Sequence, residues 1–334
     1  MVICAGKEAR APLIEKIAES FYMITLPMPF RLKHVHVFAL IHDGSVSLFD
    51  TGMNTPDTFA TLEGSLKSVG KSIRDIDRIF ITHFHTDHCG IAGRIKEISR
   101  AAIAMSKMDA RRLYNDQKTG FNFGRVKRFY CEQGLREEII DGLLELLGSF
   151  RKATIPFKVD TSLGNHESQK VGDREFEVIS VPGHTSGQVC FFFRREGILL
   201  AGDHILPDIT PNLSPDPYNA AFRPLKSFLD SLGEVEDLPV SKVYPAHGHP
   251  FSNLKARVEE IREHHRERKS IIFESVKEGP KTTFQVSLDI FGQDLPEFDQ
   301  SLAVNETYAH LVELGEEGFI KQEKIGDLVI HSVA

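Results

Sequence analysis

A cluster of metal-binding side chains follows an apolar run in the first third of the chain and constrains its fold. His83, His85, Asp87 and His88 lie within six residues, in the order His-x-His-x-Asp-His. The run at residues 78–81 before them, Arg-Ile-Phe-Ile, is typical of a buried strand. A strand that ends in a loop can direct alternate side chains at one point. Imidazole and carboxylate are ligands that zinc-like metals prefer, so this loop predicts a site for two metal ions.

The same pattern of apolar run, tight turn and polar ligand recurs elsewhere in the chain. It leads to Asp50 after residues 46–49, to His184 after residues 178–181, to Asp203 after residues 198–201 and to His247 after residues 243–244. Glycines in these turns permit unusual backbone angles and close approach to a ligand. A lone histidine after a strand is usually structural, but this recurrence together with the six-residue cluster favours one shared metal site.

These motifs resemble those of the metallo-β-lactamase superfamily, in its glyoxalase-II-like two-metal branch. The matching motifs run from Asp50 to His247 in the family's order. The resemblance implies an α/β fold, a four-layer αββα sandwich with the metals at one edge of the two sheets. It also implies the ligand roles: His83, His85 and His184 for the first metal, Asp87, His88 and His247 for the second, Asp203 bridging both, and Asp50 orienting a ligand histidine.

This ligand set predicts hydrolysis without a serine or cysteine nucleophile. Two metals about 3.5–4 Å apart can share a water and form hydroxide near neutral pH, and one metal can polarise a carbonyl or phosphoryl oxygen. We expect attack by the bridging hydroxide, positioned by Asp203, with Asp87 and Asp50 as the other catalytic carboxylates. We expect two divalent cations, zinc first, although iron and manganese also accept such ligands.

Comparison with other branches of the same family narrows the expected chemistry. The flavodiiron branch has Glu where His85 stands, so redox iron chemistry is not favoured. The commonest true β-lactamases use a Cys ligand and lack the second His of the Asp-His pair, whereas this chain has Asp87, His88 and Asp203. Lactam hydrolysis is therefore not expected as the main activity.

Composition is that of an ordinary globular protein without a membrane anchor. The 334 residues are 41% hydrophobic and 26% charged, which suits one large core with a small appendage. The four cysteines show no Cys-x-x-Cys spacing, which predicts reduced thiols and a cytoplasmic setting. Residues 1–20 mix charges without an apolar centre, unlike a signal peptide, and no apolar run approaches the ~18 residues of a membrane span.

Short apolar runs alternate with helical patterns, as expected of an α/β fold. Strands are predicted at residues 21–26, 35–41, 45–49, 78–82, 101–105, 176–181, 188–193 and 198–201, and helices at about 57–69, 91–99 and 225–232. We divide the chain into a catalytic domain at residues 1–254, with a helical lid insertion at 107–152, and a linker helix and winged-helix-like domain at 255–334.

The insertion is the expected selector of substrate. Six Lys or Arg and a single acid lie between residues 111 and 128, with aromatic residues interleaved, and residues 134–147 predict an amphipathic helix. Such a lid suits the phosphates and base of an acyl-CoA-like substrate, or a nucleic-acid strand. The alternative is a solvated basic helix over core aromatics. The residues expected to contact substrate are Arg125, Arg128 and Phe121. His204 and His249, beside predicted ligands, could also touch substrate; the alternative for both, which the sequence favours, is a polar loop histidine.

The C-terminal residues predict a small domain with a winged-helix pattern. A long helix at residues 254–277 precedes helical patterns at 282–291 and 301–314 and a hairpin formed by 319–325 and 328–333. This tail resembles that of LACTB2-like (β-lactamase-like protein 2) members of the superfamily, some of which act on RNA. Residues 281–334 hold ten acids, three Lys and no Arg, so their net charge of −7 would repel nucleic acid. We expect the tail to pack against the catalytic domain, complete a homodimer or rim the active site.

The predicted activity is hydrolysis of a thioester, an activated ester or a lactone, with a small-molecule substrate linked to CoA or glutathione. A second enzymatic hypothesis is a single-strand endoribonuclease, favoured by the tail's resemblance and disfavoured by its charge. A third is a metal-bearing regulatory module without turnover. A complete set of seven ligands argues against this last hypothesis, because a module freed from catalysis need not keep them all.

Overall fold

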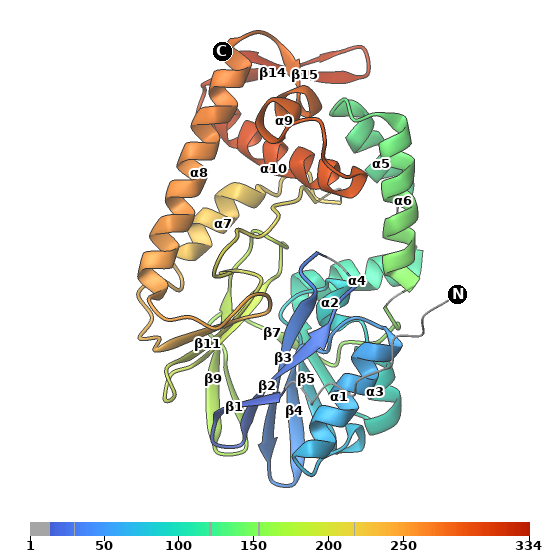
Figure 1. Cartoon of the computed structure of the whole chain (residues 1–334), viewed down its shortest axis with the longest axis vertical. Coiled ribbons are helices and arrows are strands. Elements are labelled where there is room, and N and C mark those ends of the chain that lie inside the picture. Colours follow the sequence, from blue (N-terminus) through green and yellow to red (C-terminus); the bar gives the residue numbers. More distant parts are fainter. Residues whose placement is uncertain (1–13, 30, 120–121, 153, 217) are drawn as a thin grey trace, which may run out of the picture.

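The computed structural model describes residues 14–29, 31–119, 122–152, 154–216 and 218–334. In this part of the chain two β-sheets face each other with helices on their outer sides, and a helical region extends from one end (Figure 1). None of the helices in these ranges combines the length and the apolar composition that crossing a membrane requires.

The larger sheet brings the ends of parallel strands to one edge. Its order is β1 (Ile14–Ala18), β2 (Phe21–Pro27), β3 (His34–His42), β4 (Ser45–Phe49), β5 (Ile76–Phe80), β6 (Ala102–Ser106) and β7 (Thr161–Leu163). Neighbours from β1 to β4 are antiparallel, and those from β4 to β7 are parallel. Helices α1 (Pro56–Ser68) and α3 (Ala92–Ser99) cover its outer face, with the short η1 (Ile73–Asp75) before β5.

The smaller sheet has the order β12 (Lys242–Pro245), β11 (Ile198–Gly202), β10 (Val189–Phe193), β9 (Arg174–Ser180) and β8 (Ser168–Val171). Its β11 and β12 are parallel and the other pairs are antiparallel. Helices α7 (Pro224–Leu232) and α8 (Leu254–Lys277) pack on its outer face.

Strand β10 shows how the sequence produces the layers. All five of its residues are buried, because both faces of the sheet are covered. Phe191 and Phe193 point to the core between the sheets, and Cys190 and Phe192 point to the core under α7 and α8. This period of two builds two apolar layers from one continuous apolar run. The αββα sandwich expected from the sequence is therefore confirmed.

The insertion is helical, but its helix boundaries differ from the prediction. It forms α4 (Lys107–Thr119), α5 (Phe123–Glu132) and α6 (Glu137–Lys152). The helix expected to start at Gly134 begins three residues later. Gly134 has φ +83 and lies in the turn after α5, in the left-handed conformation that commonly ends a helix at glycine.

The C-terminal region has the helices and the hairpin that the sequence predicts. After α8 come β13 (Lys281–Thr282), α9 (Thr283–Phe291), α10 (Glu297–Glu316), β14 (Ile320–Ile325) and β15 (Leu328–Val333), and these strands pair in the order β13-β15-β14. Thr282 caps α9 with a capping box, since its side chain accepts from the Gln285 backbone N–H and Gln285 accepts from the Thr282 N–H.

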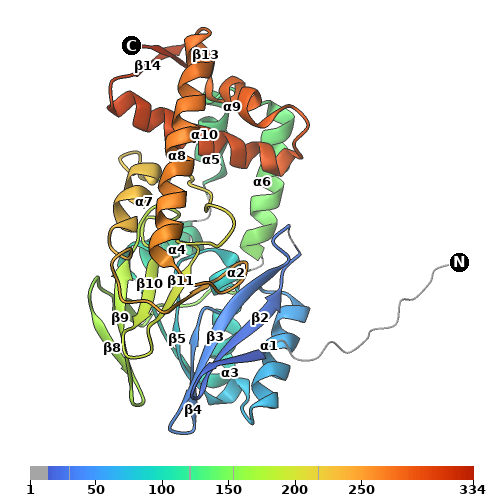
Figure 2. The ribbon, with the colours of Figure 1, turned by 60° about the vertical axis from the view of Figure 1, so that its left-hand side comes forward.

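The C-terminal region and the insertion share a hydrophobic core. Tyr130 and Ile140, from α5 and α6, belong to one buried cluster with Phe284 of α9 and Val304 of α10. Both views show α10 between α6 and the long helix α8 (Figures 1 and 2). The tail therefore packs against the rest of the chain, which is one of the placements expected for it.

Candidate metal centre

All seven residues expected to bind metal meet at one edge of the sandwich. They follow strands β5, β9, β11 and β12, with Asp87 and His88 on the short helix α2 (Thr86–Cys89). Their ligand atoms form overlapping groups that could each hold an ion: His83, His85 and His184; His83, His88 and Asp203; and Asp87, His88 and His247. The parallel pairing of β11 with β12 places Asp203 and His247 side by side.

The first group consists of three imidazole rings directed at one point. His85 Nδ1 lies 3.1 Å from His83 Nε2 and 2.9 Å from His184 Nε2. One oxygen of Asp203, Oδ2, lies 3.4 Å from His184 Nε2 and 4.0 Å from His83 Nε2. Ring nitrogens that face one another in this way suit a shared cation.

The second group uses the other oxygen of the same carboxylate. Asp203 Oδ1 lies 3.4 Å from His88 Nε2 and 3.4 Å from His247 Nε2. Asp87 Oδ2 lies 3.6 Å from His88 Nε2 and 3.4 Å from His247 Nε2. Asp203 therefore faces one group with each oxygen, which is the arrangement of a bridging ligand.

Unpartnered atoms show that this donor set fits cations. His88 Nε2, His247 Nε2 and Asp203 Oδ1 are buried and have no hydrogen-bond partner among the described residues. Burying such groups without a partner costs free energy, and a coordinated metal removes that cost. The nitrogen and oxygen donors suit zinc, iron or manganese.

Electrostatics differ between the two groups. Burial, together with the neighbouring His184, lowers the pKa of His85 to about 3, so this ring is a neutral ligand near pH 7. Burial opposes charge on His247, but Asp203 and Asp87 raise its pKa to about 10. Without a metal, a proton on the second group would balance the charge of the two carboxylates, so metal binding there would release protons.

Hydrogen bonds behind the rings fix which nitrogen faces the centre. His184 Nδ1 donates to the Asn212 carbonyl at 2.8 Å, and His247 Nδ1 donates to the His34 carbonyl at 2.8 Å. Each bond directs Nε2 toward the centre, where it can bind a metal.

Asp50 lies behind His88, as the sequence resemblance implied. Its Oδ2 accepts from His88 Nδ1 at 2.8 Å and from the Thr82 hydroxyl at 2.7 Å, while Oδ1 accepts from the Thr82 N–H at 2.8 Å. Its backbone has φ +60, a conformation that costs free energy for a residue other than glycine and is often found at functional sites. This geometry places Asp50 behind the ring of His88 instead of at the reacting atoms.

Sequence reasoning missed Asp109, which connects the two ligand loops of the first group. Asp109 Oδ2 accepts from the Phe84 N–H at 3.1 Å and from the Thr185 hydroxyl at 2.8 Å, and the residue is fully buried. Burial raises the pKa of this carboxyl to about 7. Its position just after β6, parallel to β5, was the available signal.

The residues expected to contact substrate differ in their exposure to solvent. Arg125 and Arg128 are exposed on α5, and His249 is exposed near Asp208, with Nδ1 at 3.5 Å from Oδ2. Phe121 lies outside the described residues. His204 was expected at the substrate, but its ring is fully buried against Phe228, with centroids 5.2 Å apart. This burial argues against the predicted contact.

A two-sheet sandwich with His and Asp ligands at one edge defines a class of metal-dependent hydrolases. The chain belongs to the metallo-β-lactamase superfamily, which it matches over residues 31–247. It is 27% identical over 302 residues to the "Probable metallo-hydrolase YqjP" of Bacillus subtilis, covering 88% of this chain and 91% of that protein. It is 26% identical to a "Beta-lactamase-like protein 2 homolog" of Caenorhabditis elegans, covering 92% and 88% of the two chains.

A solved structure and two partial matches extend the comparison. The crystal structure of metallo-β-lactamase family protein TTHA1429 from Thermus thermophilus has a TM-score of 0.84, 28% identity, and 94% and 99% coverage. A hydroxyacylglutathione hydrolase of Rhizobium etli is 24% identical, covering 65% of this chain and 63% of that protein. An atrochrysone carboxyl ACP thioesterase of Cryptosporiopsis is 22% identical, covering 70% and 54%.

Proposed function

We propose that this chain is a two-metal hydrolase of a thioester, an activated ester or a lactone. The observation that carries the proposal is the geometry of Asp203, whose two oxygens face the two ligand groups at 3.4 Å. The same geometry argues against the hypothesis of a regulatory module, because a module without turnover needs no bridging ligand between two groups.

The residues of the chain have separate tasks in this reaction. When bound, two divalent cations supply an activated water and polarise the substrate carbonyl. Asp203 orients that water between the groups, and Asp87 completes the second group. Asp50 holds His88 in its tautomer through the 2.8 Å bond to Nδ1. Asp109 and the Asn212 carbonyl hold the loops that carry the first group's ligands in position.

Two observations support a small activated acyl substrate linked to CoA or glutathione. Matches over about two thirds of the chain include proteins named for glutathione-thioester and acyl-carrier thioester hydrolysis. The insertion also presents exposed Arg125 and Arg128, which suit the phosphates or carboxylates of such a carrier.

We keep the domain boundary at residue 254 and propose that the C-terminal region does not bind nucleic acid. Most of α10 is buried, and Glu316 and Glu317 at its exposed end pair with Arg223 and Lys269. A helix held in this way is poorly placed to enter a groove, which disfavours the endoribonuclease hypothesis.

In the described residues Cys89, Cys131 and Cys190 are free, in keeping with a cytoplasmic setting.

The test is thiol release from acyl-CoA and glutathione thioesters by metal-loaded protein. Asp203→Asn should lower kcat at least about 100-fold, because a preorganised charged group at the reacting atoms is lost. The matched control is Asp237→Asn, which changes an exposed carboxylate paired with Lys255 and should leave turnover unchanged. Wild-type turnover by metal-loaded Asp203→Asn would contradict the role of Asp203, and absence of turnover across the panel would direct the search to lactones and phosphodiesters.

A further inference from the structure

A second cluster of metal-ligand side chains lies away from the catalytic edge, between α8 and α10. His264, His265 and Glu306 each offer one ligand atom, and these atoms lie within 4.8 Å of one another. His265 Nδ1 is 4.0 Å from Glu306 Oε1 and 3.1 Å from His310 Nε2. These separations fall in the same range as those between the ligands of the catalytic centre, 2.9 to 4.0 Å.

Like the catalytic centre, the cluster contains a buried polar atom without a hydrogen-bond partner. Glu306 Oε1 is buried and has no hydrogen-bond partner in the described part of the chain, and the ring nitrogen of His265 nearest to it, Nδ1, shares a hydrogen bond with His310 Nε2. The side chains of His265 and Glu306 are 1% and 11% exposed. Burying a carboxylate beside imidazoles with nothing bound to it is costly, and a cation would compensate the charge and complete the coordination.

One ring of the cluster is held in the same way as the catalytic ligands. His310 Nδ1 donates to the Glu306 carbonyl at 2.8 Å, which leaves its Nε2 lone pair directed at His265. His184 and His247 are fixed by backbone carbonyls through the same nitrogen. A ring that is oriented before a metal arrives loses less conformational freedom on binding.

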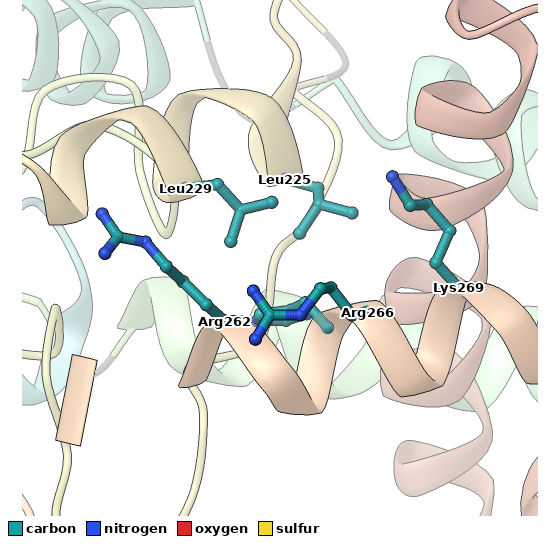
Figure 3. A pocket seen from close by; sticks show the side chains of 6 residues that line it. Leu225, Leu229, Arg262, Arg266 and Lys269 are labelled. Atoms are coloured by element: carbon teal, nitrogen blue, oxygen red, sulfur yellow. The ribbon is translucent and has the colours of Figure 1, made fainter. Parts of the chain in front are cut away.

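A cavity gives access to His265 from the surface. It has a volume of about 210 Å³ between α7 and α8 and is lined by Leu225, Leu229, Arg262, His265, Arg266 and Lys269 (Figure 3). The cations at its rim are offset by acids, since Arg262 pairs with Glu236 and Lys269 with Glu317. Arg268, the other nearby cation, lies over the Phe291 ring at 4.6 Å, and it attracts Glu306 electrostatically without forming an ion pair with it in the described part of the chain.

We propose that His264, His265 and Glu306, with His310 beside them, bind one divalent cation of the zinc type. Imidazole nitrogens and carboxylate oxygens are both zinc ligands, and two imidazoles with one carboxylate form a known set of protein ligands for zinc. The ion would fasten α8, which packs on the smaller sheet through Val258 and Ile261, to α10 of the C-terminal region. This site is separate from the catalytic centre and does not depend on the proposed reaction.

The test compares zinc content between variants of the full-length protein. Metal is removed with a chelator, zinc is restored, and bound zinc per chain is measured by elemental analysis and by titration. Glu306→Gln and His265→Gln should each bind one equivalent less than the wild type, while thioester hydrolysis is unchanged. His331→Gln is the matched control, because it removes a buried histidine of the same region outside the cluster, and it should keep the wild-type zinc content.

Further variants separate this site from the catalytic centre and from misfolding. A chain with Asp203→Asn should still lose one equivalent when Glu306→Gln is added, whether or not the protein hydrolyses any substrate. His264→Ala removes a partly exposed ligand, so the fold should persist while the affinity of one equivalent falls at least about 10-fold. Equal zinc content and affinity in the wild type, Glu306→Gln and His264→Ala would overturn the proposal.

Discussion

At the scale of single residues, the site depends on buried polar groups that touch no metal. Asp50, Asp109 and the Asn212 carbonyl each fix a ligand loop or ring from behind. That the seven expected ligands lie together could be predicted, because a dense His-x-His-x-Asp-His cluster is rare and its chemistry is specific. Asp109 could not, since a single acid after a strand resembles any surface acid until the fold buries it.

Replacing Asp109 tests this support. Asp109→Ala removes the acceptor of the Phe84 N–H and the Thr185 hydroxyl, so the affinity for the first metal should fall about 10–100-fold. Zinc titration against a competing chelator measures the change. Asp109→Asn keeps one acceptor oxygen and should recover part of the affinity; equal affinity in all three proteins would exclude a positioning role.

A buried histidine far from the site makes stability depend on pH. Burial lowers the pKa of His331 to about 4, from 6.5 in an exposed chain, so the unfolded state takes up a proton first as pH falls. The contribution of neutral His331 to the free energy of unfolding is fully present above pH 6.5 and is lost as the pH falls toward 4. Between pH 7 and pH 5 this loss amounts to about 2 kcal/mol. Urea unfolding of the wild type and His331→Gln at both pH values tests this; the variant should lose less stability on acidification, and parallel losses would refute the assignment.

At the scale of secondary-structure elements, strands with long buried apolar runs were predictable, and short strands at the edges of the two larger sheets were not. The buried strands β3, β4, β9, β10 and β11 have continuous or alternating apolar runs. Strands β1, β7 and β8 have short, mixed or polar sequences, and their extended state depends on pairing with one neighbour. The start of α6 was also misplaced, because the left-handed backbone at Gly134 is a property of the turn.

Two glycine substitutions test that turn. Gly134→Ala would force an alanine into φ +83 and place its Cβ 2.7 Å from the Thr282 hydroxyl oxygen, so unfolding free energy should fall by about 1–3 kcal/mol. Gly64→Ala, in the exposed middle of α1 with free space around it, should instead raise it by about 0.5–1 kcal/mol. Urea denaturation measures both, and a loss of the same size in the two variants would contradict the role of the turn.

At the scale of the whole molecule, the C-terminal region reaches the catalytic edge through hydrogen bonds. The Tyr130 hydroxyl donates to Asn305 Oδ1, Asn305 Nδ2 donates to the Ser214 hydroxyl, and Ser214 donates to Asn212 Oδ1. The Asn212 side-chain amide also donates to the Leu302 carbonyl of α10, and its own carbonyl holds His184. Helix α10 thus helps to position a metal ligand.

Asn212→Ala should separate that loop from α10. We expect kcat to fall about 10-fold, with KM little changed, because the His184 ring loses its fixed orientation while the substrate contacts remain. Cobalt-substituted protein should also show an altered visible spectrum. Asn219→Ala, in the same loop, is the control, because among the described residues the Asn219 side chain accepts only from the Ala221 backbone N–H. An unchanged spectrum and kcat in Asn212→Ala would show that the loop is held by other contacts.

The core shared by the insertion and the C-terminal region also has a consequence for synthesis. When α5 and α6 leave the ribosome, Ile139, Ile140 and Leu143 lack part of their cover, because Phe284 and Val304 belong to the last part of the chain. Until those last residues are made, the nascent protein therefore carries part of this apolar surface, and chaperones or aggregation compete with folding in that period. A chain that ends before α9 would therefore be prone to aggregate.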